Sequence, residues 1–396
     1  MNSPSKPPRL GRNVVSLSAV SFFNDAASEM TYPLLPLFLK TVLGASATAV
    51  GGIEGAAESA AALLKLASGW WSDRLRRRKP LVVAGYTLAA AIRPFIGIAR
   101  FVPQVLAIRV TDRIGKGIRG APRDALIADS VDPAIRGRAF GFQRAADHAG
   151  AVVGPLVAFA LLRWAGFDLR TVFLLTAIPG AVAVMTLLFG VRETPRSTAP
   201  AQSLDLKTRL GRSFWAYLGV LFLFTLGNST DAFLLLRAGQ LGISPFLLPI
   251  LWALLHVVKS ASSTPGGILS DRLGRKPLII AGWLLYAGVY FAFGRAQTQW
   301  QAWALFAVYG LYFGLTEGVE KALVADLVGP ERRGAAFGWY NLAIGVGALP
   351  ASLLFGAIWD RWGAAYAFDF GALLALAAAV GLAAAVRTGR LQGLSA

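Results

Sequence analysis

The sequence predicts an all-α integral membrane protein with twelve transmembrane helices in two six-helix bundles. Three observations lead to this fold class. Hydrophobic residues make up 55% of the 396 residues and charged residues only 15%, which is more apolar than a soluble core requires. The apolar residues gather in twelve runs, each long enough to cross a bilayer. The second half of the chain also repeats features of the first.

The first six runs cover about 13–39, 47–71, 80–100, 103–128, 136–162 and 171–191. A polar connector at 192–212, with Pro195 and Pro200, reads as a cytoplasmic linker. The other six runs cover about 213–236, 246–269, 277–294, 300–326, 335–358 and 365–386. All are expected to be helices, because an open strand leaves its backbone polar groups unsatisfied in lipid. The expected domains are therefore a bundle at 1–191, the linker at 192–212 and a bundle at 213–396.

The two halves are internal repeats. Residues 125–129, Ala-Leu-Ile-Ala-Asp, recur at 322–326 as Ala-Leu-Val-Ala-Asp, and Pro133 and Arg136 recur as Pro330 and Arg333, all at an offset of 197. Chance similarity between apolar segments does not explain matched Asp, Pro and Arg positions. A parallel duplication of six helices about an axis along the membrane normal does.

The basic residues predict the orientation. The net charge is +18, and 22 of the 39 Lys and Arg residues fall in the segments expected on the side of both termini, with ten inside the spans. Seven fall in the loops on the other side: Lys40, Arg100, Arg163, Arg170, Arg237, Arg295 and Arg361. This asymmetry follows the positive-inside rule, so both termini are expected in the cytoplasm and the protein in the inner (plasma) membrane. The charge therefore indicates contact with the lipid bilayer and not with nucleic acid.

A basic loop occurs once in each half. Residues 69–80 read Gly-Trp-Trp-Ser-Asp-Arg-Leu-Arg-Arg-Arg-Lys-Pro, and residues 267–277 read Gly-Ile-Leu-Ser-Asp-Arg-Leu-Gly-Arg-Lys-Pro. A single copy would be an ordinary positive-inside loop. Two copies, with Asp73 and Asp271 separated by 198 residues, indicate a repeated functional element.

These loops resemble the signature of the major facilitator superfamily that follows the second and eighth helices. The second copy matches fully, whereas the first has Arg76 and one extra basic residue in place of a glycine. The resemblance covers nearly the whole chain and implies a transporter. It also implies a gating role for Gly69, Asp73, Arg74, Arg77 and Asp129 and for Gly267, Asp271, Arg272, Arg275 and Asp326.

The fifth span carries Gly141, Gly150, Gly154 and Pro155. This pattern resembles the helix 5 signature of the proton-coupled antiporters of that superfamily, except that Ala158-Phe159 replaces the final pair of glycines. It therefore favours export. The alternative is generic packing, since small residues four apart let two helices approach closely.

Charged residues are abundant within the first six spans. Each unpaired charge at mid-membrane costs at least about 2.5 kcal/mol, so most must pair or face water. The candidates for proton coupling or the substrate pathway are Asp25, Glu29, Glu54, Glu58, Arg93, Arg109, Asp112, Arg113, Lys116, Asp147, His148, Asn228, Asp231 and His256. Asp25, Glu29, Glu54 and Glu58 are the candidate proton carriers, with Arg109 and Arg113 as counter-charges or substrate ligands.

The fourth span carries a basic stripe. At 100° per residue, its five basic residues share about one third of the helix circumference: Arg109, Arg113, Lys116, Arg119 and Arg123. In the superfamily the first and fourth helices of each half line the central cavity. The stripe therefore indicates either an anionic substrate or a charged coupling network, and a static lattice of ion pairs is the remaining alternative.

The second half is more neutral. Its polar members include Lys259, Glu317, Glu320 and Lys321, and its aromatic residues either form a wall for an apolar part of the substrate or pack between helices. His148 and His256, the two histidines, either carry a proton or form packing hydrogen bonds.

Other activities lack sequence support. No phosphate-binding glycine loop, nucleophile elbow or clustered His/Cys site occurs, so neither an enzyme nor a bound cofactor or metal is expected. We expect a monomeric secondary active transporter of a small solute, anionic or amphipathic in character, working by proton-coupled export. Uptake or exchange of an organic anion is the alternative within this class. A membrane-embedded sensor or partner-binding protein on the same fold is the alternative from another class.

Overall fold

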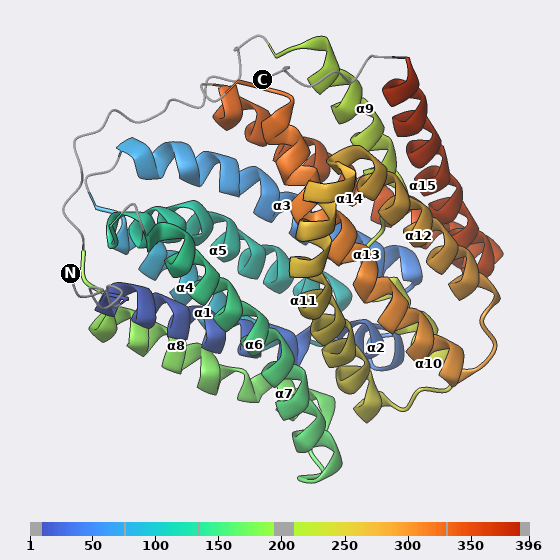
Figure 1. The fold of residues 1–396 in the computed structure, drawn as a ribbon. Helices are drawn as coiled ribbons and strands as arrows, with labels where there is room; N and C mark the ends of the chain where they lie inside the picture. The colour runs from blue at the N-terminus through green and yellow to red at the C-terminus, as the bar shows by residue number, and fades with distance from the viewer. Residues whose placement is uncertain (1–9, 75–76, 133–134, 194–209, 330–331, 389–396) are drawn as a thin grey trace, which may run out of the picture.

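The computed structural model describes residues 10–74, 77–132, 135–193, 210–329 and 332–388, and at 66 and 69–74 it describes the backbone alone. Every regular element in these ranges is a helix. The described helices cover the twelve expected spans and confirm the all-α membrane fold (Figure 1). Most of the expected linker, at 194–209, lies outside the described residues.

The first half contains six spans. They are formed by α1 (Arg12–Thr31) with α2 (Leu35–Thr41), α3 (Ala47–Arg74), α4 (Lys79–Ile92) with the 3₁₀ helix η1 (Arg93–Ile98), α5 (Val102–Asp129), α6 (Arg136–Arg163), and α7 (Leu169–Leu175) with α8 (Ala177–Gly190).

The second half repeats this arrangement. Its spans are formed by α9 (Arg212–Gly227) with α10 (Ala232–Gln240), the 3₁₀ helix η3 (Pro245–Leu247) with α11 (Leu248–Leu273), α12 (Arg275–Arg295), α13 (Gln299–Asp326), α14 (Arg333–Trp362) and α15 (Ala364–Arg387).

The first and seventh spans are both broken. Pro33 lies between α1 and α2, where its ring excludes a continuous helix. The break between α9 and α10 contains no proline; Asn228 leaves the helical conformation with a ψ of 81°. Both breaks lie beside the same cavity, described below, and expose backbone and polar side chains there.

Within the described residues, nine helical segments are long and apolar enough to span a membrane by length and composition alone. The three other spans are α1 with α2, α3 and α5, which carry most of the acidic and basic residues noted in the sequence. Their charges lower the hydropathy but are arranged inward, so these helices still belong to the bundle.

The halves are joined mainly by three helix pairs: α3 packs against α14, α6 against α11, and α2 against α10. In addition, α10 contacts α3 and η3 contacts α6. In Figure 1 the blue-to-green first half and the yellow-to-red second half lie on either side of this seam. We call the end of the bundle where α1 begins and α15 ends the terminal face, and the other end the opposite face.

The halves are tightly joined at the opposite face. A Cβ on Gly51 of α3 would lie 2.2 Å from the carbonyl oxygen of Ser352 in α14, so only glycine permits this contact. Asp360 of α14 caps the start of α3, accepting hydrogen bonds from the backbone N–H groups of Ala47 (2.8 Å) and Thr48 (2.7 Å). The opposite face is therefore closed.

Candidate functional site

A cavity of about 390 Å³ lies at the seam between the two halves. The first half contributes α1, α3 and α5, and the second half contributes the α9–α10 break, α11, α13 and α14. Its ionisable lining residues are Glu29, Glu54, Glu58, Arg113, Lys116, Asp231, Lys259 and Glu320. A site shared by both halves changes shape when the halves move.

The cavity is reached from the terminal face. Arg113 is only 8% exposed, whereas Lys116, one turn of α5 nearer that face, is exposed although it lies near the middle of its helix. The side chain of Glu58 on α3 is 54% exposed. On the opposite side of the cavity, the hydroxyls of Tyr32 and Thr230 lie 3.3 Å apart and join the two broken spans.

Two buried ion pairs lie at the first-half wall of the cavity, and Glu54 of one of them lines it. Arg109 donates two hydrogen bonds to Glu54, at 2.8 and 2.7 Å, with the Arg109 residue only 1% exposed. Arg93 donates to Asp112 at 2.7 Å, and both side chains are almost fully buried. These four residues form a fixed lattice that joins α3, α5 and η1.

The basic stripe on α5 therefore divides into two groups. Arg109 is paired, Arg119 lies over the ring of Tyr86 at 4.3 Å, and Arg123 binds the neighbouring Asp124 at 2.9 Å. Only Arg113 and Lys116 of the stripe line the cavity. The stripe is therefore not uniform: one part is paired with neighbouring groups and the other lines the cavity.

Glu29 is held by the second half of the protein. Its Oε2 accepts a hydrogen bond of 2.7 Å from the indole N–H of Trp252 on α11, and His256 Nε2 lies 3.8 Å from the same oxygen. Asp25, one turn earlier on α1, accepts a hydrogen bond of 3.0 Å from Asn24 and is in no ion pair within 4.0 Å among the described residues. The two carboxylates of α1 thus have different partners.

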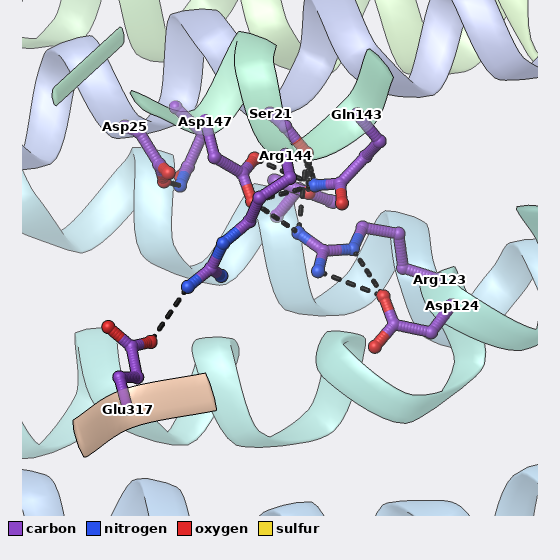
Figure 2. A network of polar contacts seen from close by, with 10 residues as sticks. Ser21, Asp25, Arg123, Asp124, Gln143, Arg144, Asp147 and Glu317 are labelled. Carbon is purple, nitrogen blue, oxygen red and sulfur yellow. Dashed lines mark hydrogen bonds and ion pairs between the residues drawn. The ribbon is translucent and has the colours of Figure 1, made fainter. Parts of the chain in front are cut away.

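A second polar network lies nearer the terminal face, between α1, α5 and α6 (Figure 2). Asp147 accepts hydrogen bonds of 2.7 Å from Gln143, and Asp25 lies beside it. Arg144 extends away from this group and binds Glu317 of α13 at 2.8 Å, across the seam. His148 lies one residue beyond Asp147 and is half-buried.

The second half offers carboxylates with neutral partners. Asp231, at the α9–α10 break, accepts a hydrogen bond of 2.6 Å from the hydroxyl of Tyr309. Glu320 accepts from Trp283 Nε1 at 2.9 Å and from the Tyr340 hydroxyl at 3.0 Å. Asn228 also lines the cavity. Neither Asp231 nor Glu320 has a Lys or Arg nitrogen within 4.0 Å in the described part of the chain.

Three residues of this region were not among the site candidates drawn from the sequence: Lys259, Glu317 and Glu320. Lys259 Nζ binds Glu317 at 2.9 Å and lies 4.1 Å from the centre of the Phe313 ring. The sequence feature that could have identified them is a charged residue within an apolar span. The spans alone do not show, however, that α11 and α13 bring Lys259 and Glu317 together.

The repeated loops contain a matching polar cluster. In the second half Arg275 binds Asp271 at 2.5 Å and Asp326 at 3.3 Å, whereas Gly267 is half-buried and Arg272 is exposed. In the first half Arg78 binds Asp129, and Arg77 is exposed. The offset between Arg78 and Arg275 is 197, the same as that between Asp129 and Asp326. The side chains of Gly69, Asp73 and Arg74 lie outside the described part.

The glycines of the fifth span, now α6, differ in their surroundings. A Cβ on Gly150 would lie 2.4 Å from the carbonyl oxygen of Phe22, and one on Gly154 would lie 2.3 Å from that of Ala26. Both glycines therefore allow α6 to contact α1. Gly141 has open space around it, and Pro155 is buried within the helix.

Comparisons with known proteins agree with this architecture. The sequence profile of the Major Facilitator Superfamily matches residues 17–258 and 219–392. An uncharacterized MFS-type transporter of Methanocaldococcus jannaschii is 32% identical over 374 residues, which cover 93% of each chain. A multidrug resistance protein, MdtH, of Klebsiella pneumoniae is 32% identical over 115 residues, covering 29% of each chain.

Solved structures share the fold at low sequence identity. The POT family transporter PepTSo superposes with a TM-score of 0.80 at 13% identity, covering 97% of this chain and 99% of that one. A bacterial homologue of the human lysosomal transporter Spinster, in an inward-facing and occupied conformation, gives 0.73 at 18% identity and 94% coverage of both. From its sequence profile, its relatives and its fold, the chain belongs to the major facilitator superfamily.

Proposed function

We propose that this protein is a proton-coupled transporter that exports a small organic solute through the cavity at the seam. The observation that carries the proposal is the cavity itself: ionisable groups from both halves line it, one end is closed and the other is open. Rocking the halves about such a site exposes it to each side of the membrane in turn, which is alternating access.

The orientation in this proposal comes from the basic loops. The terminal face carries most of the Lys and Arg residues outside the spans, which supports a cytoplasmic location for it, with both termini and the 192–212 connector. The conformation is then open to the cytoplasm. The proposal also places the protein in the inner membrane as a monomer.

Glu29 and Glu58 are the favoured proton carriers among the four candidates. Both line the cavity, and neither is held by a close ion pair: Arg113 lies 3.9 Å from Glu58, and Trp252 is a neutral partner for Glu29. Glu54, by contrast, is bound twice by Arg109. Asp25 lies beside Asp147 in the second network and is the next candidate.

The direction of transport rests on the fifth span and on the similarity of part of the chain to a multidrug resistance protein. The second candidate function is uptake or exchange of an organic anion. Arg113 and Lys116 favour it, because they place two cationic groups on the cavity wall.

The test begins by identifying the solute from the metabolites and toxic compounds whose cellular levels change on deletion of the protein and recover on complementation. The purified protein is then placed in liposomes with a pH-sensitive dye inside. We expect addition of the solute to move protons in the opposite direction. Proton movement in the same direction supports uptake, and solute exchange without proton movement contradicts coupling. A sensor gives neither flux.

The role of Glu29 has a separate test. Glu29→Gln should abolish uphill transport driven by a pH gradient while downhill exchange continues. The matched control is Asp168→Asn at the opposite face, where Asp168 caps α7 and asparagine caps a helix equally well. Uphill transport at the wild-type rate by Glu29→Gln moves the proton site to Glu58 or Asp25.

Alternating access can be tested with thiol chemistry, because the chain has no cysteine. Thr48 and Asp360 meet across the seam at the closed face, where their side-chain oxygens lie 2.6 Å apart. Joining Thr48→Cys to Asp360→Cys with a short bifunctional thiol reagent should stop transport, whereas either single cysteine should not. Continued transport by the joined protein contradicts the rocking mechanism.

A further inference from the structure

We propose that the solute is a zwitterion, with its anionic group at Arg113 and Lys116 and its cationic group at Asp231. The inference rests on the proposed function, since it names the class of solute that the cavity would carry. It follows from an asymmetry between the two walls of the cavity.

The first-half wall presents cationic groups with incomplete partners. The Arg113 residue is 8% exposed, yet its Nε has no hydrogen-bond partner among the described residues. Its nearest acidic oxygens lie 3.9 Å away on Glu58 and 4.0 Å away on Asp112, and Arg93 already holds the other oxygen of Asp112 at 2.7 Å. Arg113 also lines the cavity, and a buried guanidinium with an unused donor there can bind an anionic group.

Lys116 extends this wall by one turn. It has no ion pair within 4.0 Å among the described residues, and it too interacts electrostatically with Glu58. Arg113 and Lys116 therefore share one loosely placed carboxylate. A carboxylate or phosphate on the solute would complete the hydrogen bonding of Arg113 and add a second negative charge to the pair of cations.

The second-half wall presents the complementary charge. One carboxylate oxygen of Asp231 accepts from the Tyr309 hydroxyl at 2.6 Å, and no hydrogen bond to its other oxygen is present in the described part of the chain. Asp231 interacts electrostatically with both Glu58 and Lys259, but Lys259 is already paired with Glu317 at 2.9 Å. Asp231 itself has no ion pair within 4.0 Å among the described residues, so its carboxylate is available to a cationic group. The rings of Tyr309 and Tyr312 stack at 5.7 Å and add π faces that attract an ammonium group.

The cavity lining also includes aromatic and aliphatic side chains. Trp252, Phe224, Phe313 and Ile344 supply this apolar surface. A solute that has one ionic group of each sign, joined by a short apolar or planar segment, therefore meets a matching surface along its whole length. A solute with one charge leaves one of the two ends without a partner, which costs affinity because the unpaired group stays desolvated.

The experiment compares probes that share one ring and differ in charge. Calorimetric titration at pH 7 of the full-length protein in lipid nanodiscs would use 4-(aminomethyl)benzoate as the zwitterion. The matched probes are 4-methylbenzoate, 4-methylbenzylamine and 4-methylbenzyl alcohol. We expect the zwitterion to bind at least about ten-fold more tightly than each of the other three probes, because it forms one more hydrogen-bonded charge interaction.

Two variants assign the ends of the site. Asp231→Asn should lower the affinity for the zwitterion to that for 4-methylbenzoate and leave the latter unchanged. Arg113→Gln should lower both of these affinities and leave that for 4-methylbenzylamine unchanged. Asp168→Asn and Arg212→Gln, which change exposed groups outside the cavity, serve as controls and should bind all probes like the wild type.

The inference is overturned if the anion or the amine binds as tightly as the zwitterion, or if the zwitterion does not bind detectably. This comparison uses the wild-type protein, so it decides the question even where a variant fails to fold. Failure of the zwitterion inference can be distinguished from failure of the proposed function. If a solute with a single charge drives proton flux, the proposed transport function stands and only the zwitterion inference is refuted.

Discussion

Replacing Glu54 by glutamine should destabilise the protein more than it disturbs proton coupling. Glu54 is the sole bidentate partner of Arg109 among the described residues, and the Arg109 residue is 1% exposed. Removing the carboxylate leaves a buried guanidinium with one acidic neighbour, Asp112, at 3.6 Å. Breaking a buried ion pair on one side costs about 3–5 kcal/mol.

The size of this effect can be converted to a melting temperature. An unfolding entropy of about 2.1 cal/mol/K per residue, applied to 396 residues, gives a fall in Tm of about 4–6 °C. Tryptophan fluorescence during heating of the detergent-solubilised protein measures it, since the chain has 11 tryptophans. The double variant Glu54→Gln with Arg109→Gln should recover most of the loss, because it removes both charges.

Glu58→Gln is the matched control for this prediction. The Glu58 side chain is 54% exposed and 3.9 Å from Arg113, so its loss should cost less than about 1 kcal/mol. It should instead alter transport. An unchanged Tm for Glu54→Gln together with loss of uphill transport would refute the reasoning and return Glu54 to the group of proton carriers.

Three further predictions address the seam, its closed end and the topology. Trp252→Phe removes the indole donor to Glu29 and should shift the pH dependence of transport, with Tm lowered by at most a few degrees; an unchanged pH profile removes Trp252 from the coupling site. Gly51→Ala places a Cβ 2.2 Å from the carbonyl oxygen of Ser352, so it should prevent closure of the opposite face. Cysteines placed in the cavity should then react faster with a thiol reagent added at the opposite face. Labelling at the wild-type rate would show that the helices adjust to the added methyl group. A reporter that works only in the cytoplasm should be active when it is fused after Thr198. Activity of a reporter that works only on the other side of the membrane would overturn the orientation.

The fold was predictable from the sequence because lipid restricts the choices. Apolar runs of this length have one solution in a bilayer, and the repeat at an offset of 197 fixes how the runs are grouped. The breaks were not equally predictable. Pro33 marks the one in the first span, whereas the break at Asn228 contains no proline and is marked only by the polar run Gly-Asn-Ser-Thr-Asp at 227–231.

The site was predictable as a set of residues but not as a geometry. Helical periodicity places Arg109 and Arg113 on one face of a helix, yet the first is fully paired and the second lines the cavity. The difference depends on which residues of the neighbouring α3 point at each, and a single sequence does not contain that register. The same limit hid the contact between Arg144 and Glu317, which are 173 residues apart and belong to different halves.

The repeat also shows how the two halves diverged. Tyr86, Arg123 and Gln143 of the first half correspond, at the offset of 197, to Trp283, Glu320 and Tyr340 of the second. In both halves a charged side chain sits among polar partners from neighbouring helices: Gln143 lies beside Asp147 near Arg123, and Glu320 accepts from Trp283 and Tyr340. Corresponding positions of the two halves thus both carry a charged residue, but the charge is positive at Arg123 and negative at Glu320.

This divergence bears on how the halves move. The first half is held together by buried ion pairs such as Arg109–Glu54, and the second by aromatic contacts such as the stack of Phe224 on Trp283 at 4.6 Å. The polar links that cross the seam in the described part of the chain include exposed contacts at each face. Asp360 at the closed face and Arg144 at the open face are two of them. Exposed hydrogen bonds and ion pairs contribute little net stability, because water replaces them when they break. In the proposed rocking mechanism, these links would break at one face and form at the other, while the interactions within each half would keep it rigid.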